Sequence, residues 1–143
     1  IDRRPIAMRD IIKRFFSGKE TSDGLDQAQR EATIDLLLLC MHADNNLDLN
    51  EERIINRVSQ RFAWKSETGL DDYIKAATAG VLGIIGSGDD RAAFMRGVSR
   101  RLRNSEAKFR AVKLCKLLFY SDMQLHSQEE AFIKVIEQVL GVD

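Results

Sequence analysis

Acidic side chains recur in two similar segments of the chain, and their chemistry is the first indication of function. The carboxylates that coincide when the sequence is shifted by 78 residues are, in the first and second copy, Asp44, Glu51 and Glu52, and Asp122, Glu129 and Glu130. Carboxylate oxygens are hard ligands, which suit Ca²⁺ or Mg²⁺ better than Zn²⁺ where no thiolate is near. The six residues are therefore candidate ligands of a divalent cation.

Local structure offers a second explanation of the same motif. Asp48 with Glu51, and Ser127 with Glu130, have the spacing of a capping box, in which two side chains bond the free amides at the start of a helix. Capping does not account for Asp44, which follows an apolar helix where the helix dipole disfavours an anion. For Asp44 and its counterpart in the second copy, an Asx-type turn and a cation site both remain open.

The spacing of apolar residues predicts the elements that hold these carboxylates. It indicates helices at about residues 6–17, 27–41, 49–62, 70–85, 90–102, 106–121 and 128–140. The matching segments 34–62 and 112–140 indicate a duplicated unit of helix, acidic loop and helix. We therefore expect an all-α bundle of about seven helices, in which residues 1–24 form an amphipathic helix and linker and residues 25–143 form one domain.

The second of these helices is expected at the centre of the bundle. Asp26 precedes it in the position of an N-cap, and its last six residues, Leu36–Met41, are apolar on every face. A helix without a polar face must be covered on all sides. Cys40 and Cys115 lie in apolar helices and are expected to be core thiols.

The repeated motif resembles that of TerB-like proteins, a family that includes the tellurite-resistance protein TerB and the N-terminal domains of some DnaJ-type co-chaperones. The resemblance covers about residues 27–141 and rests on the six carboxylates named above. It implies an all-α fold, cation binding by those carboxylates and a role in a stress response. Asn45 and Met123 stand where the family has a glycine after each aspartate.

Other motifs in the chain do not support a further site. The segment from Asp44 begins like a calcium-binding EF-hand loop, but Leu49 replaces the required glycine and Ile55 the final glutamate. Four glycines from residue 80 to residue 88 lie at the end of a predicted helix and not after a strand, which is atypical of a dinucleotide site and indicates close helix packing or a loose helix end. With no nucleophile motif or phosphate loop, we expect a non-catalytic module.

The net charge of zero conceals charged blocks. Residues 20–52 hold nine acids against Arg30, whereas residues 91–116 hold nine bases against Glu106. The basic block predicts docking to an anionic protein or membrane surface through Arg91, Arg96, Arg100, Arg101, Arg103, Lys113 and Lys116. Helical spacing places Arg96, Arg100 and Arg103 on one face, and nucleic acid is disfavoured because the block forms no recognisable helix-turn-helix recognition surface.

This docking role is the alternative to cation binding, with the acidic loops then purely structural. The longest apolar run has six residues, far short of the roughly 20 that cross a bilayer. We expect a cytoplasmic protein, which on the second hypothesis is peripheral to the inner face of the membrane.

Overall fold

The computed structural model describes residues 24–43, 64–119 and 127–142, which form α-helices and their connections. The helices are α2 (Gln27–Ala43), α4 (Leu70–Ile84), α5 (Gly88–Leu102), α6 (Ser105–Phe119) and α7 (Ser127–Leu140). Each agrees with a predicted helix to within two residues at either end, and the described residues contain no strand, so the all-α class is confirmed. The helices predicted at 6–17 and 49–62 lie outside the described residues, as do the first acidic loop and residues 120–126 of the second, so the seven helices and the duplication stay predictions.

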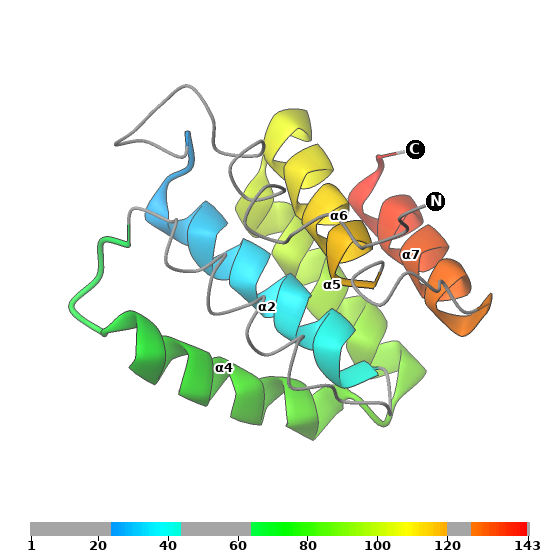
Figure 1. Ribbon diagram of the computed structural model, residues 1–143, viewed down its shortest axis with the longest axis horizontal. Coiled ribbons are helices and arrows are strands. Elements are labelled where there is room, and N and C mark those ends of the chain that lie inside the picture. Colours follow the sequence, from blue (N-terminus) through cyan, green and yellow to red (C-terminus); the bar gives the residue numbers. More distant parts are fainter. Residues whose placement is uncertain (1–23, 44–63, 120–126, 143) are drawn as a thin grey trace, which may run out of the picture.

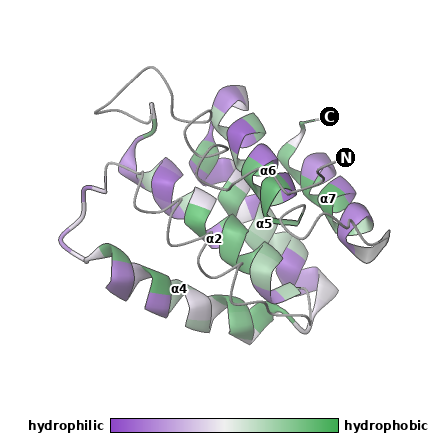
Figure 2. Ribbon diagram, viewed as in Figure 1, coloured by the Kyte–Doolittle hydropathy of each residue, from purple (hydrophilic) through white to green (hydrophobic). Residues whose placement is uncertain are grey.

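Helix α2 is the centre of the fold, as predicted (Figure 1). It packs against α4, α5 and α6, and every residue from Ala32 to Met41 is buried. Figure 2 shows hydrophobic residues along α2 after its more polar start. Cys40 and Cys115 are both fully buried, as expected of core thiols.

Helix α7 completes a four-helix bundle by packing against α5 and α6. Helices α5 and α6 contact each other less than either contacts α2 or α7. They therefore occupy opposite corners of the bundle, with α2 and α7 at the other two corners, and their solvent faces point in different directions. In Figure 1, α5 lies behind α2 and α6. None of the described helices combines the length and apolar character needed to cross a bilayer.

The start of α2 is tied to the end of α5. Asp26 caps α2 as predicted, because its Oδ1 accepts from the Gln29 amide at 2.9 Å while the Gln29 Oε1 accepts from the Asp26 amide at 2.9 Å. The buried Gln29 side chain also donates to the Leu102 carbonyl at 2.8 Å, which satisfies the last turn of α5. Arg103 then leaves the helix with a φ of 68°, unusual for a side chain larger than glycine, and its guanidinium pairs with Asp26.

Helix α4 is held more loosely than the others. Val81 is its only fully buried residue, and Gly69 at its N-cap position provides no side-chain bond. Among the described residues, no side chain or backbone outside their own stretch of helix lies within 4 Å of where a Cβ would be on Gly80, Gly83 or Gly86. These glycines therefore lie on the exposed surface and at the end of α4. This fits the loose helix end that the sequence allowed, and not the close packing of helices.

The central position of α2 predicts unequal effects of two leucine truncations. Leu39→Ala, at a residue that is 0% exposed in α2, should lower the free energy of unfolding by about 3 kcal/mol, because it removes buried surface and leaves a cavity. Leu82→Ala, at a residue 55% exposed on α4, should change it by less than about 0.5 kcal/mol. Urea denaturation of both variants measures this, and equal losses would contradict the assignment of α2 as the core.

Candidate functional site

The six predicted cation ligands are only partly within the described structure. Asp44, Glu51, Glu52 and Asp122 lie outside the described residues. Glu129 and Glu130 stand in the first turn of α7, where carboxylates complement the helix dipole. Their environments differ, because Glu129 is buried and Glu130 is exposed. Among the described residues, no group of three or more His, Cys, Asp or Glu side chains is arranged to hold a metal ion.

The seven predicted docking residues fall into two groups. Four bond within the described structure: Arg91 with the Ile85 carbonyl, Arg101 with Asp35, Arg103 with Asp26, and Lys116 with Glu137 at an Nζ–Oε2 distance of 3.3 Å. The prediction that Arg103 shares a helical face with Arg96 and Arg100 is wrong, because α5 ends at Leu102 and Arg103 turns toward α2.

The other three docking residues are exposed and lie on two helices. Arg96 and Arg100 project from α5, and neither makes an ion pair with a described acid. Lys113 projects from α6, where its Nζ lies 5.7 Å from the centre of the Phe109 ring. Because α5 and α6 occupy opposite corners of the bundle, these cations form two separate surfaces, which we call the α5 face (Arg96 and Arg100) and the α6 face (Phe109 and Lys113).

A buried polar cluster joins three helices and involves a residue not predicted as functional. Asp35 of α2 is only 7% exposed and accepts a hydrogen bond from the Tyr73 hydroxyl of α4 at 2.8 Å. Its other carboxylate oxygen pairs with the Arg101 guanidinium of α5 at 2.8 Å. The Trp64 ring lies against Tyr73 with 5.1 Å between ring centres, and Trp64 in turn donates to the Thr68 carbonyl.

The electrostatics of this cluster are dominated by burial. Burial raises the pKa of Asp35, and the hydrogen bonds from Tyr73 and Arg101 oppose but do not cancel that shift. Burial also raises the pKa of Tyr73, an effect that the neighbouring Asp35 charge reinforces. For Arg101, burial disfavours the charged form, but the bond to Asp35 outweighs it and raises the pKa. The cluster therefore joins a carboxyl group whose pKa is raised to a phenol and a guanidinium whose pKa values are raised as well.

The chemistry of this cluster is that of a structural link. The two carboxylate oxygens of Asp35 are bonded to groups of the protein itself, and Tyr73 stays protonated over the whole physiological range. One sequence signal did indicate it, since Asp35 is a single acid within an otherwise apolar stretch of α2. A charge at such a position must find a partner in the fold.

Asp35 and Asp26 should affect stability in opposite ways as the pH changes. The pKa of Asp26 is lowered by the Gln29 amide and by Arg103, so its stabilising effect is present above its ordinary value of 3.8 and lost in more acidic solution. The raised pKa of Asp35 means that its most favourable contribution is present below 3.8 and is lost as the pH rises through the folded value.

The matched variants are Asp26→Asn and Asp35→Asn, each of which keeps the side-chain shape and an accepting oxygen. Urea denaturation from about pH 3 to pH 7 spans the ordinary carboxyl range. The stability of wild type relative to Asp35→Asn should fall as the pH rises, whereas that relative to Asp26→Asn should rise. Two trends of the same sign would refute the assigned environment of Asp35.

Comparison with known proteins identifies no relative of this chain. No protein-family model matches the chain, and neither the curated proteins nor the solved structures contain a match.

Proposed function

We propose that this chain is a non-catalytic binding module that docks onto an anionic partner through exposed cations of its helical bundle. One observation carries the proposal. Arg96, Arg100 and Lys113 are exposed and make no ion pair with a described acid, although other bases of the same block are bonded inside the fold. Exposed cations without acidic neighbours attract anionic surfaces within a Debye length, whatever the net charge of the whole chain.

The polar interior supports a structural rather than a catalytic use of its charged groups. Asp35, Tyr73 and Arg101 bond one another, and Gln29 and Asp26 are used in joining α2 to α5. In keeping with the resemblance to TerB-like proteins, we place the module in a stress-response setting related to tellurite resistance. We place it in the cytoplasm, where anionic proteins and the inner face of the membrane are both within reach.

Docking predicts binding to a soluble polyanion that weakens with salt. Poly-glutamate serves as the probe, and its affinity, measured by fluorescence anisotropy, should fall steeply between low and physiological ionic strength. Arg96→Gln, Arg100→Gln and Lys113→Gln combined in one variant should lower the affinity about a hundredfold, since each removed cation contributes roughly fivefold near a strongly anionic surface.

A control variant removes the same charge elsewhere. Lys65, Lys75 and Lys134 are also exposed, on other parts of the described structure, and their replacement by glutamine should change the affinity much less. Equal losses in the two triple variants would mean that only total charge matters, and the proposal would then be wrong.

A second candidate function is the binding of a divalent cation by the repeated carboxylates. The observation that favours it is the burial of Glu129 in the first turn of α7. The carboxylate of this proposed ligand is shielded from solvent, whereas that of the neighbouring Glu130 is exposed. The ligands proposed are Asp44, Glu51 and Glu52 in the first copy and Asp122, Glu129 and Glu130 in the second. Ca²⁺ and Mg²⁺ are the cations these oxygens suit.

Substitution by asparagine separates the cation site from the Asx-type turn. Asp44→Asn keeps the side-chain oxygen that closes such a turn but removes the charge that a hard cation requires. Wild type should gain about 1.4 kcal/mol of stability at a Ca²⁺ or Mg²⁺ concentration ten times the dissociation constant, and Asp44→Asn should gain much less. Calorimetry and thermal melting measure this, and the absence of both heat and a melting shift with either ion excludes the site.

A further inference from the structure

We propose that the α6 face is the surface that docks, and that its partner is the anionic headgroup layer of a lipid membrane. This inference rests on the proposed docking function and specifies where and to what the module binds. It follows from the residues that surround each exposed cation.

The two cationic faces differ in their apolar content. On the α6 face, Phe109 is 56% exposed, which is the largest exposure of a bulky apolar side chain among the described residues. The other two such residues are Leu82 on α4 and Val135 on α7, so the described part of α5 contributes none. Helix α5 also carries Asp89 and Asp90 in its first turn, which reduce its positive field. Of the two cationic faces, only the α6 face therefore combines a cation with an exposed apolar side chain.

The positions of Phe109 and Lys113 suit the two layers of a membrane surface, the boundary of the acyl chains and the phosphates above it. One helical turn separates them, and the Lys113 ammonium lies 5.7 Å from the ring centre. An aromatic ring at a bilayer interface occupies the boundary of the acyl chains, while a lysine extends its ammonium to the phosphates above. Contact between ring and ammonium on one exposed turn allows both groups to enter their layers together.

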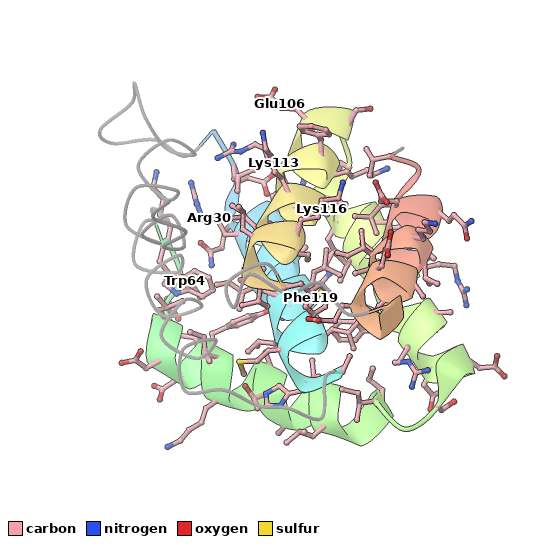
Figure 3. The ribbon with its side chains drawn as sticks, turned by 45° about the vertical axis from the view of Figure 1, so that its right-hand side comes forward. Arg30, Trp64, Glu106, Lys113, Lys116 and Phe119 are labelled. Atoms are coloured by element: carbon pink, nitrogen blue, oxygen red, sulfur yellow. The ribbon has the colours of Figure 1, made fainter. Side chains whose placement is uncertain are left out.

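The charge around this pair also suits a headgroup layer. Glu106 is the only acid of α6, against the bases Lys108, Arg110, Lys113 and Lys116. Figure 3 shows Glu106 at the start of α6, with Lys113 and Lys116 further along the helix, and the Lys116 side chain is 41% exposed beside its partner Glu137. Lysine is a compact charge on a flexible stem that does not require a fixed two-oxygen geometry, so it tolerates the irregular spacing of lipid phosphates and carboxylates.

Co-sedimentation with lipid vesicles tests the proposal on the whole chain. Phosphatidylcholine vesicles containing phosphatidylserine should bind the protein, whereas pure phosphatidylcholine vesicles should bind it weakly, and added salt should reduce the difference. Lys113→Gln should lower the partition coefficient about fivefold. Phe109→Ala should also lower it, on phosphatidylserine vesicles at constant salt.

Each variant has a matched control on another helix. Arg96→Gln removes one exposed cation from the α5 face, and Leu82→Ala truncates an apolar side chain with 55% exposure on α4. Both controls should bind vesicles as wild type does. Thermal melting of all four variants should be unchanged, because each replaces an exposed side chain. Equal losses with Arg96→Gln and Lys113→Gln would overturn the assignment to α6.

Poly-glutamate binding distinguishes failure of this inference from failure of the proposed function. If the protein binds poly-glutamate but not phosphatidylserine vesicles, docking stands and the lipid partner is wrong, which points to an acidic protein. If it binds neither, both proposals are wrong. Vesicle binding that requires Lys113 and Phe109 supports both.

Discussion

The burial of α2 on every side is the constraint on which the described structure depends. From Ala32 to Met41 this helix offers no residue to water, so its neighbours must enclose it completely. Helices α4, α5 and α6 each cover part of it, and α7 covers the sides of α5 and α6 that α2 does not reach. Removal of this apolar surface from water is the main favourable term in folding, and it gathers α4, α5 and α6 around α2.

Asp35 fixes how the helices around α2 are positioned along it and rotated about it. Apolar packing alone tolerates small rotations and shifts of one helix along another, but a carboxylate inside the packed region does not. Its two oxygens are bonded by Tyr73 and Arg101, which come from helices on different sides of α2. Burying this carboxyl group is unfavourable, as the raised pKa of Asp35 shows. The bonds that it makes in return fix the register of α4 and α5 against α2. At the start of α2, Asp26, Gln29 and Arg103 join the same two helices, α2 and α5, by polar bonds nearer the surface.

The elements of the fold could be predicted from sequence because their causes are local. Apolar periodicity locates α2, α4, α5, α6 and α7, and the Asp26 cap marks the first residue of α2. The partners of Asp35 could not be predicted, because Tyr73 lies 38 positions away and nothing near either residue specifies the pairing. The separation of Arg96 and Arg100 from Lys113 has the same origin, since it follows from which helices meet. For the acidic motif, only Glu129 and Glu130 are described, so the contribution of the other four carboxylates stays a prediction.

The weak attachment of α4 has a consequence for the motions of this protein. A helix with one fully buried residue and two glycines in its last two turns gains little on docking and loses more backbone entropy than an alanine-rich helix does. Such a segment is the first to open in a fold whose other helices are well enclosed. Amide hydrogens of α4 should therefore exchange with solvent deuterium through a local opening, while those in the middle of α2 exchange only when the whole bundle unfolds. The part of the fold that Tyr73 and Val81 attach to α2 is then a layer that opens before the rest of the bundle unfolds.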